Sequence, residues 1–320
     1  MSGGAKIKVR VADIVTVNSL IKRFRFVTLD GSDMPAFSGG AHIVVEMDDH
    51  GTRRLNPYSL SSSPEDRSGY EISVRRDDTG RGGSLFLHNH VKIGMELEIS
   101  YPVNLFPLDT RAKKHLMIAG GIGITPFLAQ IAQLSFFGGK FELHYSARSK
   151  PLGAYMDRLT SDYPANVHCY FDDEKQTIDL ANVLSMQPLG THLYVCGPKG
   201  MINWVLATGK HIGWPAHAIH HEEFLAPGIG QPFEVELATS QKTFTVGAAQ
   251  SLLEAIEAAG VDAPYLCRGG ACGQCETEVL KCDGQILHRD HWLTEEDHVS
   301  NTKIMPCVSR FEGNTLILDR

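Results

Sequence analysis

The first hundred residues alternate apolar and polar positions in short segments, which is the pattern of strands with one buried face. Clusters of Gly, Pro and Asp separate these segments. Several short strands without intervening helices predict a small antiparallel β-barrel over residues 1–110. The expected strands cover residues 6–17, 21–29, 42–47, 70–74 and 95–100.

From residue 114 the pattern changes to apolar strands that alternate with helical stretches. This alternation predicts a parallel sheet with helices on both faces over residues 111–226. The expected strands are 115–119, 141–146, 167–171 and 191–196, and the expected helices are 126–134, 154–160 and 179–186.

A third domain is expected over residues 227–320. Residues 225–232 (LAPGIGQP) have the composition of a linker. Two expected strands (233–238 and 242–246), an expected helix (251–259) and a cysteine-rich loop follow it. The fold class is therefore multidomain, with a β-barrel, a parallel α/β domain and a small C-terminal domain.

The formal charge of −7, from 30 Lys and Arg against 37 Asp and Glu, argues against a nucleic-acid partner, because phosphate binding needs a basic face. It leaves room for an acidic surface that docks a basic protein. The N-terminal segment lacks the apolar region of a signal peptide. The most apolar stretch, residues 116–129, is too short and too rich in glycine to span a bilayer. We therefore expect a cytoplasmic protein that does not enter a membrane.

Five of the seven cysteines lie in the last sixth of the chain. Cys267, Cys272 and Cys275 form a C-x4-C-x2-C motif, and Cys307 follows after 31 residues, which is the spacing of plant-type [2Fe–2S] ligands. A thioredoxin-like dithiol, a structural zinc site and inert buried thiols are the alternatives. The dithiol leaves Cys267 and the three loop glycines unexplained, and zinc sites usually pair two short clusters. We favour the iron–sulfur interpretation.

A glycine turn after the first strand of the second domain is a candidate nucleotide site. Gly120, Gly121 and Gly123 permit close approach of a pyrophosphate, and the helix expected from Pro126 directs its N–H groups toward it. The turn is not G-x-G-x-x-G, so a tight strand–helix connection is the alternative. Cys196-Gly197-Pro198 ends a later strand of the same sheet, at the edge where such sheets bind ligands.

Two segments of the barrel suit a flavin. The segment Asn56-Pro57-Tyr58-Ser59-Leu60 holds an aromatic side chain able to lie on a flavin ring, with a hydroxyl beside it. The segment Gly80-Arg81-Gly82-Gly83-Ser84 offers backbone N–H groups, a guanidinium and a hydroxyl to one phosphate. An ordinary strand tyrosine and a flexible hairpin are the alternatives.

The order of these features resembles the phthalate dioxygenase reductase family, which includes vanillate demethylase and carnitine monooxygenase reductases. The likeness covers nearly the whole chain and extends to His288-Arg289-Asp290 and Cys307-Val-Ser-Arg310. It implies FMN in the barrel, NADH on the parallel sheet and a ferredoxin-like β-grasp domain with a [2Fe–2S] cluster at the C-terminus.

One position departs from the family pattern. The usual Arg-x-Tyr-Ser is Asn56-Pro57-Tyr58-Ser59 here, so Arg54 or Arg53 is expected to contact the flavin phosphate instead. By resemblance, Phe224 covers the flavin where the nicotinamide enters; a phenylalanine of the hydrophobic core is the alternative.

The motifs and the resemblance together predict an oxidoreductase that passes a hydride from NADH to FMN, and then single electrons through the cluster to a Rieske-type oxygenase. A flavin can bridge two-electron and one-electron chemistry. The hydride is expected to reach the flavin near Tyr58 and Ser59. Thr125 and the glycine turn are expected to position the pyrophosphate.

Acidic residues after the strand 167–171 predict a preference for NADH over NADPH. Asp172 and Asp173, with Glu174, lie near the expected ribose edge, where carboxylates repel a 2′-phosphate. Arg148 follows the second strand of the sheet, within reach of a 2′-phosphate, and its positive charge favours NADPH instead. A solvated acidic turn without a binding role is the alternative.

Two other functions are open. One is an FAD-containing reductase of a diiron oxygenase or a cytochrome system. The other is a redox-responsive binding module without enzymatic activity, whose cluster reports oxidation state.

Overall fold

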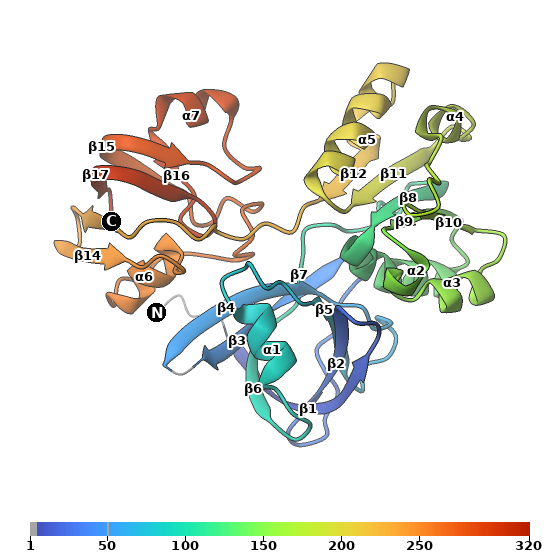
Figure 1. Ribbon diagram of the computed structural model, residues 1–320, viewed down its shortest axis with the longest axis horizontal. Helices are drawn as coiled ribbons and strands as arrows, with labels where there is room; N and C mark the ends of the chain where they lie inside the picture. The colour runs from blue at the N-terminus through green and yellow to red at the C-terminus, as the bar shows by residue number, and fades with distance from the viewer. Residues whose placement is uncertain (1–4, 50) are drawn as a thin grey trace.

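The computed structural model describes residues 5–49 and 51–320. Three sheets follow one another along the chain, with separate cores. In Figure 1 the N-terminal sheet lies at the bottom, the second at the upper right and the C-terminal one at the upper left. The predicted multidomain fold class is confirmed.

The first sheet is antiparallel and strongly curved, with strand order β4-β3-β6-β1-β2-β5 and with β7 paired to β3. Its edge strands approach each other at a bridge between Leu60 and Ile72, which nearly closes a barrel. Alternate residues of the first strands, such as Val9, Val11 and Phe24, are fully buried in its core. The strands are β1 (Lys6–Thr16), β2 (Ile21–Thr28), β3 (Ala41–Asp49), β4 (Thr52–Ser59), β5 (Tyr70–Arg75), β6 (Glu96–Ser100) and β7 (Val103–Asn104).

Two barrel elements differ from the sequence-based expectation. The segment with Tyr58 is strand β4, which pairs with β3 along its whole length. Helix α1 (Gly83–Asn89) interrupts the succession of strands that we expected to be free of helices. It forms because Gly82, at φ 101°, turns the chain into the helix, and because Phe86 and Leu87 bury one of its faces.

The second sheet is parallel, with strand order β10-β9-β8-β11-β12. The order reverses between β8 and β11, and ligands of such sheets bind at the carboxyl ends of the strands on either side of this point. Helices cover both faces, as predicted; α5 was not expected, although Ile202 and Val205 form a buried stripe along it. The elements are β8 (Lys114–Gly120), η1 (Gly121–Ile124), α2 (Thr125–Phe137), β9 (Phe141–Ala147), η2 (Lys150–Leu152), α3 (Met156–Asp162), β10 (Val167–Phe171), α4 (Leu180–Ser185), β11 (Thr191–Cys196), α5 (Lys199–Ile212), η3 (Ala216–Ala218) and β12 (Ile219–Glu222).

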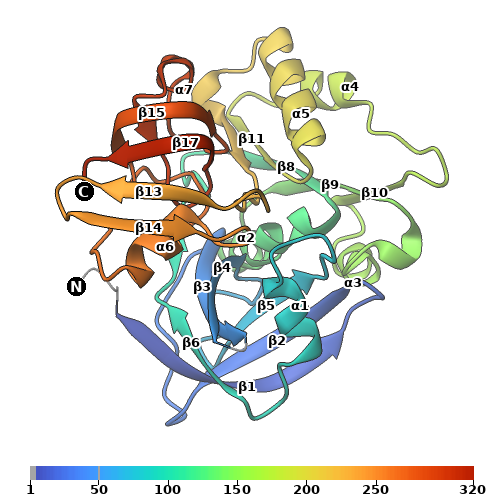
Figure 2. The ribbon, with the colours of Figure 1, turned by 60° about the vertical axis from the view of Figure 1, so that its left-hand side comes forward.

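The third sheet is mixed, with strand order β14-β13-β17-β15-β16. The first and last long strands, β13 and β17, lie parallel at its centre, and helix α6 packs on one face. This is the β-grasp arrangement that the resemblance implied (Figure 2). The elements are β13 (Phe233–Leu237), β14 (Lys242–Val246), α6 (Leu252–Ala258), β15 (Thr277–Leu287), α7 (Glu295–Ser300), β16 (Lys303–Ile304) and β17 (Arg310–Leu318).

Polar contacts join the three units. Arg81 of the barrel pairs with Glu254 of α6 at 2.6 Å, and His291 pairs with Glu223, just after β12, at 2.8 Å. The domain limits at 110/111 and 226/227 fall in the connections between the sheets and stay predictions. No helix within the described residues is long and apolar enough to cross a membrane.

Candidate functional site

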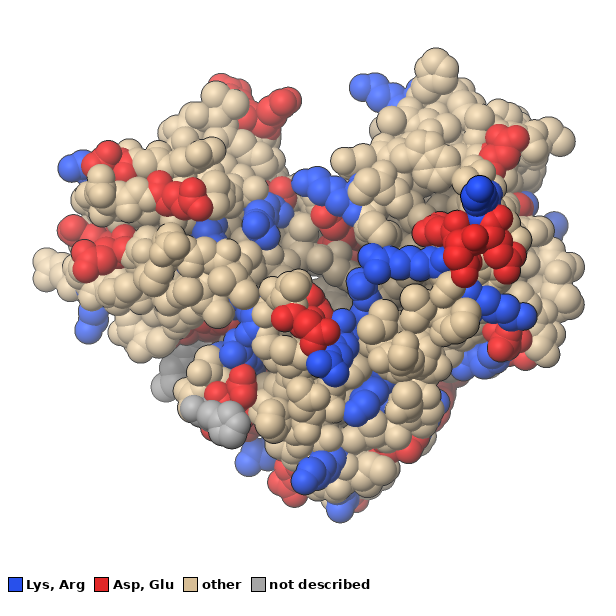
Figure 3. All heavy atoms as spheres, in the orientation of Figure 1, with Lys and Arg blue, Asp and Glu red and all other residues tan. Residues whose placement is uncertain are grey.

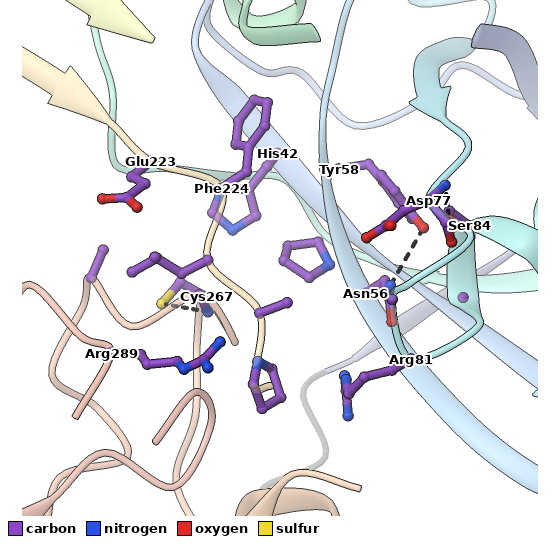
Figure 4. Close-up of a pocket in the computed structure, with 18 of the residues that line it drawn as sticks. His42, Asn56, Tyr58, Asp77, Arg81, Ser84, Glu223, Phe224, Cys267 and Arg289 are labelled. Carbon is purple, nitrogen blue, oxygen red and sulfur yellow. Dashed lines mark hydrogen bonds between the residues drawn. The ribbon is translucent and has the colours of Figure 1, made fainter. Parts of the chain in front are cut away.

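A cavity of about 760 Å³ lies where the barrel, the segment after β12 and the cysteine loop meet (Figure 4). Its volume is within the range of sites that bury a cofactor. The residues that line it include many predicted ones: Asn56, Tyr58, Ser59, Arg81, Gly82, Gly83, Ser84, Phe224 and Cys267. Residues more than 200 positions apart in the sequence therefore share one cavity.

Strand β4 forms the barrel wall of this cavity. Tyr58 directs its hydroxyl group toward Asn56, whose Nδ2 lies 3.5 Å from the phenol oxygen. Burial raises the pKa of Tyr58 well above its usual value, so the phenol stays protonated. Ser59 is buried, at the same wall. This strand offers an aromatic ring, an amide and a hydroxyl to a bound ligand.

The glycine segment before α1 packs closely against side chains of β4, and its backbone forms a shallow cradle there. A Cβ atom on Gly83 would lie 2.5 Å from Nδ2 of Asn56, and one on Gly82 would lie 3.1 Å from the Arg54 guanidinium. Ser84 accepts the N–H of Asp77 through its hydroxyl at 3.1 Å. Only backbone without a side chain fits between the barrel wall and the start of this helix.

Three predicted phosphate or flavin ligands have other partners. Arg54 does not line the cavity, and its Nε donates to Asp49 at 2.9 Å. Arg81 lines the cavity, but its guanidinium also pairs with Glu254. Leu60 is fully buried in the barrel core and does not line the cavity.

Two residues of the cavity wall that the sequence did not single out have buried polar atoms without partners in the described part of the chain. His42, opposite Ser59 across β3 and β4, has no hydrogen-bond partner for Nε2 among the described residues, and the same holds for Oε2 of Glu222. Burial lowers the pKa of His42 to about 4 and raises the pKa of Glu222 to about 8. Both groups are therefore neutral near pH 7. Buried polar atoms without partners are rare in proteins, so a ligand with polar edges, such as a flavin, fits this wall.

A second cavity of about 400 Å³ lies at the carboxyl ends of the parallel strands. A Cβ on Gly123 would lie 2.3 Å from the carbonyl oxygen of Cys196, and one on Gly120 would lie 2.7 Å from Pro198. The predicted residues that line this cavity are Gly120, Gly121, Gly123, Arg148, Asp172, Gly197 and Pro198. The glycine turn and the end of β11 thus form one surface, as expected for a nucleotide site.

Three residues predicted for the nucleotide site do not line this second cavity. Thr125 is buried, and its hydroxyl donates to the carbonyl of Ile122 at 3.0 Å. Cys196 is also buried, and burial raises the pKa of its thiol. Asp173 is exposed beyond the cavity rim.

Phe224 lines both cavities, together with Glu223. It is 47% exposed, which rules out the alternative of a core phenylalanine. In Figure 4 its ring points away from Cys267 and Arg289. A ligand of the second cavity therefore reaches the first at this side chain.

The four predicted cluster ligands are free thiols that converge in the C-terminal unit. Cys267 and Cys272 contact each other, as do Cys275 and Cys307, through hydrogen bonds between their thiol groups. The Cys272 thiol and backbone N–H groups lower the pKa of Cys267. A set of four thiols supported by backbone donors fits a [2Fe–2S] cluster.

Glycines shape the backbone of the cysteine loop. Gly270 and Gly273 have φ near +75°, and the N–H of Gly269 donates to Sγ of Cys267 at 3.3 Å. Cys267 also lines the large cavity. The loop therefore brings one predicted cluster ligand to the edge of the large cavity.

Comparison with known proteins covers all three units. Family models match residues 8–107 (oxidoreductase FAD-binding domain), 100–219 (dimethylamine monooxygenase subunit DmmA-like, N-terminal domain) and 235–312 (2Fe-2S iron-sulfur cluster binding domain). Phthalate dioxygenase reductase from Burkholderia cepacia is 35% identical over 98% of this chain and 97% of its own. A solved structure of a phthalate dioxygenase reductase superposes with a TM-score of 0.89 at 34% identity, over 99% of this chain and 98% of that one.

The chain belongs to the phthalate dioxygenase reductase family. A carnitine monooxygenase reductase subunit from Acinetobacter baumannii is 43% identical over 97% of this chain and 96% of its own. The β subunit of a haem-dependent oxidative N-demethylase from Ectopseudomonas mendocina is 45% identical over 97% of this chain and 98% of its own. As a member of this family, the chain is an oxidoreductase with a flavin-binding unit and a [2Fe–2S] unit.

Titration of Glu222 predicts a pH-dependent stability. Burial raises the pKa of its carboxyl group to about 8 in the folded chain, well above the ordinary value of a glutamate. The folded state therefore holds a proton that the unfolded state has lost, and the free energy of unfolding falls as the pH rises through this window. Glu222→Gln removes this dependence. We expect urea denaturation at pH 5, 6.5 and 8 to show the variant gaining stability relative to the wild type as pH rises; parallel pH profiles would refute the buried neutral carboxyl.

Proposed function

We propose that this chain is an NADH-dependent reductase that holds FMN in the large cavity and passes single electrons through its [2Fe–2S] cluster to a Rieske-type oxygenase. The continuity of the cavity is the main support. Tyr58 and Ser59 lie on one wall, Cys267 lies on another, and Phe224 opens toward the nucleotide cavity. A nicotinamide, a flavin and a cluster can therefore be placed in that order.

The flavin is held by the barrel in this proposal. The N–H groups of Gly82 and Gly83 and the hydroxyl of Ser84 hold the phosphate at the start of α1. Tyr58 and Ser59 orient the ring system, and the neutral His42 and Glu222 satisfy its polar edge. Arg81 is shared between the phosphate and Glu254, while Arg54 supports the cradle from behind Gly82.

The nucleotide and the cluster use the other two units. The backbone of Gly120–Gly123 accommodates the pyrophosphate, with Arg148 and Asp172 at the rim. Phe224 covers the flavin site until the nicotinamide takes its place. The four cysteines bind the cluster. The bound flavin supplies the step from two-electron to one-electron transfer, and the protein supplies distance and orientation.

A haem-dependent acceptor is the second candidate partner, because one relative at 45% identity is the β subunit of a haem-dependent oxidative N-demethylase. Affinity purification of the full chain from its own cells, followed by absorption spectroscopy of the retained partner, separates the candidates. A Soret band identifies a haem partner. Rieske-type absorption and EPR signals support our proposal.

Loss of one cluster ligand tests the order of the electron carriers. We expect Cys272→Ser to abolish the visible absorbance of the cluster and electron delivery to the oxygenase. Reduction of 2,6-dichlorophenolindophenol by NADH is expected to survive, because the flavin lies before the cluster. Cys282→Ser, outside the motif, is the matched control. Loss of dye reduction with flavin still bound would contradict this order.

The identity of the flavin is tested by its release. The cradle at Gly82–Ser84 offers one phosphate site, whereas the matching family model is named for FAD. We expect heat-released cofactor to elute as FMN in stoichiometric amount on reversed-phase chromatography. Stoichiometric FAD would assign the chain to the alternative class of FAD-containing reductases.

The preference for NADH is expected to depend on Asp172 rather than on Asp173, because only the first of these two lines the nucleotide cavity. A carboxylate beside the ribose repels the 2′-phosphate of NADPH. We expect Asp172→Ala to lower the ratio of kcat/KM for NADH to that for NADPH about 10-fold, a repulsion of about 1.4 kcal/mol. Asp173→Ala is the matched control and should leave the ratio unchanged. Equal use of both cofactors by the wild type would refute the preference.

A further inference from the structure

The net charge of the chain is concentrated in one unit. Residues 227–320 contain seven Lys and Arg against fourteen Asp and Glu, whereas residues 1–226 contain 23 of each sign. The barrel and the nucleotide unit together are therefore neutral. The whole formal charge of −7 belongs to the unit that holds the cluster.

Much of the positive charge of this unit is used inside it. Arg268 is buried and pairs with Glu257. The guanidinium of Arg310 donates to three backbone carbonyls, and Arg320 donates to the hydroxyl of Thr277. These cations do little to neutralise the outer surface of the unit.

A tryptophan is exposed beside the cysteine loop. Trp292 is 51% exposed, and a Cβ on Gly273, between Cys272 and Cys275, would lie 2.2 Å from its ring. Its indole N–H donates to Glu276 at 2.8 Å, which fixes the ring against the loop. Exposed tryptophans held in one orientation are frequent anchors of protein interfaces.

Two exposed carboxylates follow this tryptophan closely in the chain. Glu295 and Glu296 are exposed on α7, and neither forms an ion pair within the described part of the chain. Lys303 pairs with Glu276 at 3.0 Å and with Asp297 at 3.7 Å, so these two acids are largely neutralised. Figure 3 shows acidic atoms at the top of the C-terminal lobe, where Figure 1 places α7.

We infer that Trp292, together with Glu295 and Glu296 of the following helix α7, is the docking surface for the oxygenase component, whose matching face carries an apolar recess bordered by Lys or Arg. The inference rests on the proposed function. Because Cys267 faces the internal cavity, an external acceptor has to approach the exposed side of the loop, where Gln274 and Trp292 lie. Charge complementarity there raises the rate of encounter and orients the acceptor toward the cluster.

Cytochrome c, a basic one-electron acceptor, is the probe for this surface. We expect Glu295→Gln/Glu296→Gln to raise the KM for cytochrome c about 3- to 10-fold at low ionic strength, and the difference to shrink in 0.5 M salt. The matched control is Asp33→Asn/Glu65→Gln, which removes the same charge from exposed positions of the barrel. The control is expected to keep the wild-type KM. Equal effects of the two pairs, or none from the α7 pair, would overturn the inference.

Trp292 is tested in the same assay with Trp292→Ala and Trp292→Phe. We expect the alanine variant to raise the KM for cytochrome c and the phenylalanine variant to restore most of the loss, with cluster absorbance intact in both. If the alanine variant keeps the wild-type KM, Trp292 is not part of the docking surface. Anaerobic bleaching of the cluster by NADH separates the failure of the two proposals. If the wild-type cluster is not bleached, the proposed function is refuted. If it bleaches normally and all variants keep the wild-type KM, only the docking surface is refuted.

Discussion

A buried ion pair between Arg81 and Glu254 joins the flavin barrel to the C-terminal unit. Its atoms lie 2.6 Å apart, and the two side chains are 11% and 9% exposed. Glu254 is held in place by its reciprocal hydrogen bonds with Ser251 at the start of α6, so its carboxylate faces Arg81 without further ordering. Removal of one partner leaves a buried charge uncompensated, which costs about 3–5 kcal/mol. The cavity depends on this pair, because its barrel wall and its cysteine wall belong to the two units that the pair connects.

The sequence predicted the architecture well because local patterns and chain order carry it. Alternation of apolar positions predicted most strands of the barrel, and the cysteine spacing singled out four thiols that the fold brings together: Cys267, Cys272, Cys275 and Cys307. Strand β4 and helix α1 were missed, since a segment rich in Arg, Asn and Pro and a segment rich in Gly have weak intrinsic preferences. Tertiary packing against β3 and the barrel core decides their structure.

The site itself was harder to predict where it depends on contacts between distant segments. The ion pair of Arg81 with Glu254 spans 173 residues, and no local motif indicates it. His42 and Glu222 are ordinary polar residues in the sequence. Their importance comes from the burial of their polar atoms in the cavity wall, which holds both groups neutral and leaves an atom of each without a partner among the described residues. Thr125 and Cys196 are an error of the other kind. They belong to motifs whose glycines line the nucleotide cavity, but their own side chains are buried and do not line it.

The floor of the nucleotide cavity is backbone packed on backbone, since Gly123 meets the carbonyl of Cys196 with no room for even one methyl group. A floor of this kind contains no side chain that rotates to suit a different ligand, and it tolerates no substitution without moving a strand. The rim is different, because Arg148 and Asp172 are side chains at the surface. Redesign of the cofactor preference is thus confined to a few rim positions, and it can proceed there without disturbing the backbone frame that we propose for the pyrophosphate.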